Sequence, residues 1–148
     1  MSYTYEYPRA AVTADCLLMT KDEEPQVLLV RRGNEPFKGM WAIPGGFMEM
    51  DETTEQCAVR ELEEETGVKI SVEDIYEIGA YSKVDRDPRH RTVSVAYISF
   101  VDKMLEAKGC DDAAEAQWWP IDSLPDLAFD HEDIINDAIE IYDLAIDE

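Results

Sequence analysis

The sequence predicts an α/β fold with three layers, in which helices cover both faces of a mixed sheet. Several apolar segments have the length and the β-branched content that are typical of strands. Two longer segments, one near the middle of the chain and one at its end, have the composition or the apolar stripe of helices. Strands that are combined with a helix for each face favour an α/β/α sandwich, because each layer must bury its apolar surface against the next.

The first half of the chain contains two predicted strands and one helix. Residues 12–19 and Gln26–Arg32 are apolar stretches of strand length, and the polar segment 21–25 between them predicts a hairpin turn. The helix is expected from residue 53 or 54 to residue 66. Gly67 follows the helix and ends it, because glycine adopts the left-handed backbone of a helix end without steric cost.

The second half is predicted to add three strands and a helix. Segments 76–82 and Thr92–Val101 have strand character, and a loop over 102–114 precedes a short strand over 115–120. The last helix is expected over 130–145. Asp130 is its predicted N-cap, because a side-chain oxygen at that position accepts a hydrogen bond from a free backbone N–H. Its predicted buried stripe consists of Ile134, Ile135, Ala138, Ile141, Tyr142 and Ala145.

Length and composition predict one domain over residues 1–148. With 45% hydrophobic residues, a chain of 148 residues can bury a core without disulfides. Its 34 acidic and 13 basic residues give a net charge of −21, which disfavours binding to nucleic acid or to an anionic membrane. No apolar run reaches the roughly 18 residues of a membrane span, and residues 1–9 lack the apolar stretch of a signal peptide. The expected location is the cytoplasm.

The first predicted helix carries a cluster of carboxylates. Glu61, Glu64 and Glu65 are spaced i, i+3 and i+4, so they share one face of the helix. Such a run is often only a solvated face, since glutamate is a good helix former. The Pro-Gly-Gly sequence at residues 44–46 favours another interpretation, because a glycine turn lets the backbone approach a phosphate or expose a carbonyl to an ion. Together these features predict a magnesium site that bridges the carboxylates to a phosphate.

These residues resemble the signature of the Nudix hydrolases. The positions that match the Nudix box are Gly46, Glu52, Arg60, Glu61, Leu62, Glu64, Glu65, Gly67 and Val68. Residues 28–32 and 118–120 also look like the sequence context of the family. The resemblance implies a Nudix-like α/β/α fold over most of the chain and a pyrophosphohydrolase that uses Mg²⁺, with Mn²⁺ as the alternative metal.

The resemblance also implies which residues bind the metal. Glu61 and Glu65 would be ligands, and Glu64 would be a ligand or the general base. The carbonyl group of Gly45 or Gly46 would be a further ligand. Magnesium at such a site neutralises the charge of a diphosphate and lowers the pKa of a bound water. Water is then the nucleophile, and no covalent intermediate with the protein is required.

Three further residues are expected to support catalysis. Arg60 and Glu52 would form an ion pair that holds the helix against the preceding loop and so positions the metal ligands. Otherwise Glu52 is an exposed acid at a helix start, where the helix dipole favours it. Some Nudix members add an acidic residue from outside the box, and Glu115 is the preferred candidate in a segment that also contains Asp111 and Asp112. A solvated surface side chain is the alternative for Glu115.

A basic loop over residues 83–91 narrows the expected substrate. The sequence Gly-Ala-Tyr-Ser at 79–82, followed by Arg86 and Arg89, resembles the ADP-ribose pyrophosphatase-like branch of the family. Both guanidinium groups offer planar forks for phosphate oxygens. Surface ion pairs are the alternative for the two arginines.

An earlier segment supplies the other candidate binding residues. Arg32 ends a strand and is expected to contact a phosphate, while Phe37 and Trp41 are candidates for stacking on a base. Core packing is the alternative for Trp41, because tryptophan is usually largely buried. The two histidines, His90 and His131, are interpreted as ordinary surface or helix-cap residues.

The predicted activity is the hydrolysis of ADP-ribose to AMP and ribose 5-phosphate. The alternatives are a hydrolase of oxidised nucleoside triphosphates, an enzyme for a nucleotide sugar or dinucleotide, and a sensor that binds a nucleotide sugar without cleaving it. The expected partner is a small-molecule nucleotide, with no nucleic acid and no membrane. Proteins that resemble this chain are often homodimers, and the alternating Tyr3, Tyr5 and Tyr7 favour an added strand or a dimer contact.

Overall fold

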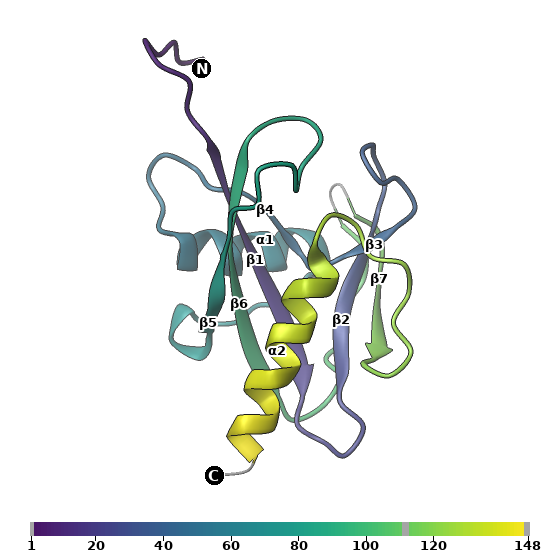
Figure 1. Cartoon of the computed structure of the whole chain (residues 1–148). Coiled ribbons are helices and arrows are strands. Elements are labelled where there is room, and N and C mark those ends of the chain that lie inside the picture. Colours follow the sequence, from purple (N-terminus) through teal and green to yellow (C-terminus); the bar gives the residue numbers. More distant parts are fainter. Residues whose placement is uncertain (1, 111–112, 147–148) are drawn as a thin grey trace.

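The computed structural model describes residues 2–110 and 113–146, with side chains up to residue 143 (Figure 1). Its strands are β1 (Ala11–Thr20), β2 (Gln26–Arg32), β3 (Trp41–Ala42), β4 (Gly45–Phe47), β5 (Tyr76–Tyr81), β6 (Thr92–Val101) and β7 (Ala113–Pro120). Its helices are α1 (Thr54–Thr66), the short 3₁₀ helix η1 (Val72–Asp74) and α2 (His131–Ile146). Within the described ranges, no helix is long and apolar enough to cross a membrane.

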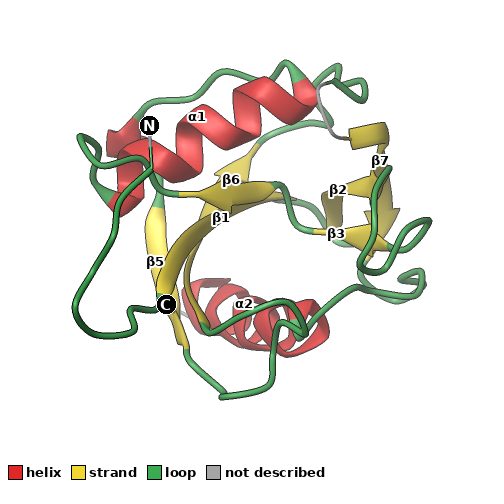
Figure 2. Ribbon diagram, turned by 90° about the horizontal axis from the view of Figure 1, so that it is seen from above, coloured by secondary structure: helices red, strands yellow, loops and turns green. Residues whose placement is uncertain are grey.

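The two α-helices lie on opposite faces of the sheet, as Figure 2 shows. Strand β1 explains this arrangement, because alternate residues of a strand point to opposite faces. Ala14, Cys16 and Leu18 belong to the core on the α1 side, whereas Leu17 and Met19 belong to the core on the α2 side. All of these side chains are fully buried. The predicted three-layer α/β/α sandwich is therefore confirmed.

The sheet is mixed, and one edge of β1 pairs with two different strands. Strand β6 runs parallel to β1 over the full length of both strands, and the main strand order is β3-β2-β1-β6-β5. On its other edge, β1 pairs with β2 through Met19 and Val27, and with β4 through residues 13–15. Between these two pairings, the N–H of Cys16 donates to the carbonyl of Pro44 at 2.9 Å. Strands β1 and β2 therefore separate toward the β4 end, and a cavity opens there.

Helix α1 begins and ends where the sequence predicts. The Thr53 hydroxyl accepts the N–H of Gln56 at 3.1 Å, and the Gln56 side chain accepts the N–H of Thr53 at 2.9 Å, which together form a capping box. Gly67 has a φ of 79° and donates its N–H to the carbonyl of Glu63 at 2.8 Å. Because both ends are fixed by local hydrogen bonds, α1 holds its carboxylate face in a defined direction.

Three local expectations differ from the structure. The Pro-Gly-Gly segment is not a turn, since Gly45 begins strand β4 and pairs with Asp15 of β1. Strand β7 begins at Ala113, before the predicted residue 115, because Ala113 still pairs with Arg32 of β2. At Asp130, the predicted N-cap of α2, the backbone carbonyl accepts the N–H of Asp133 at 3.0 Å, whereas the hydrogen bonds of the carboxylate to described residues come from Arg86.

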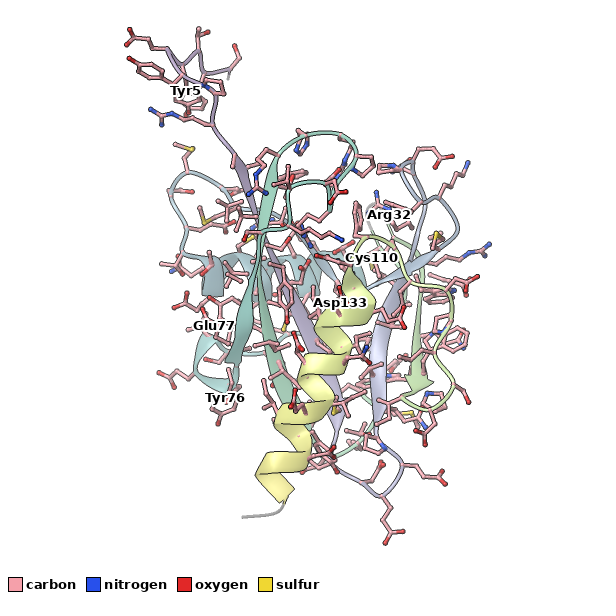
Figure 3. All side chains as sticks on the ribbon, viewed as in Figure 1. Tyr5, Arg32, Tyr76, Glu77, Cys110 and Asp133 are labelled. Carbon is pink, nitrogen blue, oxygen red and sulfur yellow. The ribbon has the colours of Figure 1, made fainter. Side chains whose placement is uncertain are left out.

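The two ends of the chain add smaller corrections. Residues 2–10 form no strand and extend away from the sandwich, with Tyr5 exposed on this segment (Figure 1, Figure 3). In helix α2, the fully buried members of the predicted stripe are Ile134, Ile135 and Ala138. Ala145, which was predicted to extend the stripe, lies outside the described side chains.

Candidate active site

A cavity of about 370 Å³ lies where β1 and β2 separate. Helix α1 contributes carboxylates to its wall, β4 contributes glycines, and β2 and the loop after β5 contribute arginines. Arg32, at the end of β2, lies at the same end of the molecule as the start of α2 (Figure 3). The ionisable residues of the wall are Asp15, Arg31, Arg32, Glu35, Glu49, Arg60, Glu61, Glu64, Glu65, Arg86, Asp87, Arg89 and His131. Carboxylates that face arginines across one cavity suit an anionic ligand that is bound together with a cation.

Arg60 organises the carboxylates of α1. Its Nε and Nη2 donate to the two carboxylate oxygens of Glu52 at 2.9 and 2.6 Å. Its Nη1 donates to Glu61 at 2.8 Å and to Glu64 at 3.0 Å. Its Nη2 also donates to the carbonyl of Phe47 at 3.1 Å. One guanidinium group thereby ties α1 to β4 and offsets the repulsion among three carboxylates.

The glycines of β4 lie directly against the carboxylate face of α1. The N–H of Gly45 donates to Oε1 of Glu65 at 2.7 Å. A Cβ atom on Gly46 would lie 2.6 Å from the carboxylate of Glu61, and a Cβ atom on Gly45 would overlap the side chain of Asp15. Side chains at these two positions would therefore push the carboxylates away, so glycine is required for this close approach.

The donor atoms at this face suit a hard divalent cation. The carboxylates of Glu61, Glu64 and Glu65 and the carbonyls of β4 are all oxygen ligands. In the described parts of the chain, however, no three acidic, histidine or cysteine side chains converge on one point. Glu61 and Glu64 face the same Nη1 of Arg60, which shows that they can share one cationic centre, and Glu65 faces the N–H of Gly45. The residues fit a divalent cation if these carboxylates exchange their present donors for it.

Two glutamates that Arg60 binds, Glu61 and Glu52, have pKa values that shift in opposite directions. Burial raises the pKa of Glu61 above its ordinary value, although the hydrogen bond and charge of Arg60 oppose this, and Glu64 and Glu52 add to the rise. Hydrogen bonds from Arg60 lower the pKa of Glu52 to about 2. Glu52 is therefore an anion at neutral pH and anchors Arg60. A positive charge that approaches Glu61 favours its ionised form, which burial disfavours.

The Glu52–Arg60 ion pair predicts a pH-dependent loss of stability. The pKa of Glu52 falls from its ordinary value of 4.5 to about 2, so ionised Glu52 stabilises the folded protein above pH 4.5 and loses this effect as the pH falls toward 2. We expect the difference in unfolding free energy between the unmodified protein and Glu52→Gln to shrink over this pH range. Denaturant titrations at a series of pH values measure it. A difference that stays constant between pH 4.5 and 2 would contradict the prediction.

Arg86 borders the cavity, but its guanidinium group is already engaged. Its Nε and Nη2 donate to the two carboxylate oxygens of Asp130 at 2.9 and 2.6 Å, and its Nη1 donates to Oγ of Ser94 at 2.7 Å. The side chain of Arg86 is only 3% exposed. The structure therefore corrects both interpretations of Arg86, because it forms a buried ion pair instead of a free fork for phosphate or a surface ion pair.

Arg89 and Arg32 surround an aromatic ring that the sequence did not single out. The guanidinium carbon of Arg32 lies 5.0 Å from the ring centre of Phe129, and that of Arg89 lies 5.9 Å from it. Arg89 also lies 5.6 Å from the ring of Phe47, and its Nη2 pairs with Asp87 at 2.8 Å. Ring faces attract cations, so Phe129 helps to hold two arginines at the cavity wall.

The carboxylate face of α1, the guanidinium group of Arg60 and the glycines of β4 thus meet in one cavity wall, and Glu52 pairs with Arg60. These elements carry the signature motif of the sequence. The family model described as NUDIX domain matches residues 9–138. The chain belongs to the Nudix family. Nudix hydrolases generally use divalent metal ions, which agrees with the oxygen donors of this wall.

Known Nudix proteins with similar sequences include an enzyme and a regulator. The chain is 44% identical to the ADP-ribose pyrophosphatase of Methanocaldococcus jannaschii, over 88% of this chain and 74% of that protein. It is 33% identical to the ADPR responsive transcriptional repressor NtrR of Acinetobacter baylyi, over 90% of this chain but only 54% of the repressor. This chain therefore spans about half of the repressor's length.

A solved Nudix structure supports the fold. The NUDIX domain of Shewanella oneidensis NrtR, determined in complex with ADP ribose, is similar with a TM-score of 0.82 and 33% sequence identity. The alignment covers 90% of this chain and 89% of that one. The Nudix fold predicted from the sequence motif is therefore confirmed.

Sequence reasoning missed two buried residues of the Nudix cavity. Asp15 is 5% exposed, and within the described residues its Oδ2 is one of two fully buried side-chain atoms without a hydrogen-bond partner. Burial raises the pKa of Asp15 to about 7, against the opposing effect of Arg86. His131, interpreted as a surface or cap residue, is also only 5% exposed, which corrects that interpretation. An acidic residue within an apolar strand was the available signal for Asp15, whereas nothing local marked His131.

Glu115 does not lie in the wall of the Nudix cavity. Its carboxylate pairs with Nη1 of Arg31 at 3.2 Å, and its side chain is 48% exposed. The role of an extra catalytic acid therefore finds no support in the position of Glu115, although Arg31 itself borders the cavity. Asp111 and Asp112 lie outside the described residues.

The two aromatic residues expected to stack on a base also lie outside the cavity wall. Phe37 packs edge-to-face against Phe129, with ring centres 4.8 Å apart. Trp41 packs edge-to-face against Trp119 at 5.2 Å and joins the core on the α2 side. Core packing, the alternative for Trp41, describes its position better than base stacking. Phe37 contributes indirectly, because it supports the Phe129 ring.

Proposed function

We propose that this chain is a magnesium-dependent hydrolase that cleaves ADP-ribose to AMP and ribose 5-phosphate. The observation that carries the proposal is a cavity whose wall contains both the glutamates of α1 and the arginines Arg32 and Arg89. Such a cavity can hold a diphosphate between a cation and guanidinium groups. The 44% identity to an ADP-ribose pyrophosphatase supports this substrate over the other nucleotides considered.

The proposed mechanism assigns a task to each side of the cavity. Glu61 and Glu65, with a carbonyl of β4, would hold Mg²⁺ or Mn²⁺, and Glu64 would be a further ligand or the base. When bound, the cation neutralises phosphate charge and activates water. Arg32 and Arg89 hold phosphate oxygens on the opposite side.

Two residues complete the proposed catalytic arrangement. Glu64 is the candidate base, because its side chain is 43% exposed and its carboxylate can accept the proton of the attacking water. Arg60, anchored by Glu52, positions the glutamates without contacting the substrate. The water adds to one phosphorus atom while the bridging oxygen of the diphosphate leaves with the other phosphate.

A sensor that binds ADP-ribose without cleaving it is the second candidate. Its support is the similarity to the ADP-ribose complex of the NrtR domain and to an ADPR responsive repressor. Hydrolysis of oxidised nucleoside triphosphates remains a prediction from the sequence. Four further points also remain predictions from the sequence: the homodimer, the cytoplasmic location, and the lack of nucleic-acid and of membrane partners.

A substrate panel tests the proposal. We expect the purified protein with Mg²⁺ to release AMP and ribose 5-phosphate from ADP-ribose faster than it cleaves an oxidised nucleoside triphosphate or a nucleotide sugar. Chelation of the metal should stop the reaction, and Mn²⁺ should restore it. Calorimetric binding of ADP-ribose with no product over hours would instead support the sensor. A clear preference for the oxidised triphosphate would replace the proposed substrate.

A further inference from the structure

His131 occupies an unusual position for a histidine at the start of a helix. It is the first residue of α2, its side chain is 5% exposed, and it belongs to the cavity wall. Its neighbour Phe129, also in the wall, has a φ of 54°, a left-handed conformation that non-glycine residues rarely adopt. The rings of Phe129 and His131 lie 5.6 Å apart. The chain thus accepts backbone strain where it turns these two rings toward the cavity.

The tautomer of His131 follows from its hydrogen bond to Ile43, which lies between β3 and β4. The N–H of Ile43 donates to Nδ1 of His131 at 2.9 Å, so Nδ1 is an acceptor and carries no proton. A neutral imidazole then carries its proton on Nε2. Burial lowers the pKa of His131 to about 4, with Arg86 and Arg32 adding to the decrease and Asp130 opposing it. The ring is therefore neutral at pH 7, with Nε2–H as a fixed donor.

The Nε2–H donor has no hydrogen-bond partner among the residues that the structure describes. Among the described residues, the His131 side chain forms one hydrogen bond, which it accepts from the N–H of Ile43. This bond uses Nδ1 and leaves Nε2 unused. Nε2 is also not among the fully buried unpaired side-chain atoms of the described residues, so it reaches the open space of the cavity. A donor that is fixed in direction at a cavity wall is available to a ligand that brings a hydrogen-bond acceptor.

The surroundings indicate which ligand group accepts this hydrogen bond. Arg32 and Arg86 are close enough to affect the charge of the ring, and Arg32 and Arg89 surround the adjacent Phe129. Ile43, which fixes the ring, is only two residues from Gly45 at the carboxylate face. The donor therefore belongs to the same cavity wall as Arg32 and Arg89, whose charges favour an anionic oxygen near them.

We propose that His131 is a ligand-binding residue whose Nε2–H donates a hydrogen bond to an anionic phosphate oxygen of the diphosphate. This inference deepens the proposed function and rests on it for the choice of ligand. The contact adds a neutral, directional donor to a site whose other phosphate-binding groups are charged. Such a donor fixes the orientation of the diphosphate between the arginines and α1, beyond holding its charge.

Two substitutions distinguish the roles of Nδ1 and Nε2 of His131. His131→Asn keeps an acceptor near the position of Nδ1 for the N–H of Ile43 but places no donor at Nε2. His131→Gln reaches the position of Nε2 with an amide N–H. We expect His131→Asn to weaken the binding of inorganic pyrophosphate in the presence of Mg²⁺ by about 10- to 100-fold, the usual effect of losing a hydrogen bond to a charged group. His131→Gln should recover most of the affinity.

Titration calorimetry with inorganic pyrophosphate gives the dissociation constants, and thermal unfolding shows whether each variant is folded. KM and kcat for ADP-ribose are measured in parallel, and His131→Asn should raise KM more than it lowers kcat. Unchanged pyrophosphate affinity in folded His131→Asn would overturn the inference, and so would a loss restricted to ADP-ribose, which would move the contact to a sugar or base. If the unmodified protein binds pyrophosphate but does not cleave ADP-ribose, the proposed function fails while the titration still decides the role of His131. Lack of pyrophosphate binding by the unmodified protein overturns the inference as well.

Discussion

Replacing Glu64 with glutamine is expected to lower kcat for ADP-ribose on the order of 10²–10⁴-fold, the usual effect of removing a positioned acid–base group. Glu64 shares Nη1 of Arg60 with Glu61, but its side chain is 43% exposed, whereas that of Glu61 is 15% exposed. Glutamine keeps the size of the side chain and an oxygen that can accept from Arg60. It loses the negative charge and the ability to take a proton, so the reaction should fail while the fold remains intact.

The matched control for this variant is Glu63→Gln. Glu63 is an exposed neighbour on the same helix and does not belong to the cavity wall, so its replacement should leave kcat unchanged. Rates measured over a range of Mg²⁺ concentrations distinguish the two proposed roles of Glu64. If excess Mg²⁺ restores the rate, Glu64 acts mainly as a metal ligand, and if kcat stays low, it acts as the base. Full activity of Glu64→Gln at ordinary Mg²⁺ would contradict both roles of Glu64.

Replacing Arg86 with methionine is expected to lower the unfolding free energy by roughly 3–5 kcal/mol, the typical cost of breaking a buried ion pair from one side. Arg86 is 3% exposed and Asp130 is 14% exposed, so the Asp130 carboxylate would be left without its main partner in a largely dry environment. Ser94 would lose a hydrogen bond at the same time. Asp15, whose pKa Arg86 lowers, would also lose a compensating charge. Denaturant unfolding of both proteins measures the difference.

The control and the double variant make this result specific. Arg91→Met removes an exposed guanidinium whose hydrogen bond to the Lys83 carbonyl is long, at 3.4 Å, and should change stability by less than about 0.5 kcal/mol. The double variant Arg86→Met with Asp130→Leu should recover part of the lost stability, because no buried carboxylate is then unpaired. A stability loss in Arg86→Met no larger than in Arg91→Met would contradict the structural role of Arg86.

The same ion pair explains why stability and ligand binding are linked in this protein. Arg86 belongs to the loop that carries Arg89, and Asp130 lies between Phe129 and His131 at the start of α2. The pair therefore holds the arginine loop against the segment that presents both rings to the cavity. Arg86 was expected to bind phosphate directly. Instead, it fixes the positions of Arg89 and His131, which are proposed to bind phosphate.

The sequence by itself determined the parts of this protein that depend on neighbours along the chain. Helix α1 lies where it was predicted, because its capping box and the glycine at its end are interactions within four residues. The face shared by Glu61, Glu64 and Glu65 follows from helix geometry alone. The same spacing also matched the Nudix box and so indicated the family.

Only the tertiary structure decided which of the remaining charged and aromatic residues meet in the cavity. Arg86 pairs with Asp130, 44 positions away, and His131 is fixed by Ile43, 88 positions away. Neither partner can be recognised from local pattern, because a buried polar group selects whichever donor or acceptor the fold brings next to it. Glu115, Phe37 and Trp41 show the converse, since their residue types suited the site but β7 and the segment before β4 direct them to other contacts. Local spacing along the chain fixes the carboxylate face of α1. The separation of β1 from β2 decides which other residues share the cavity with that face.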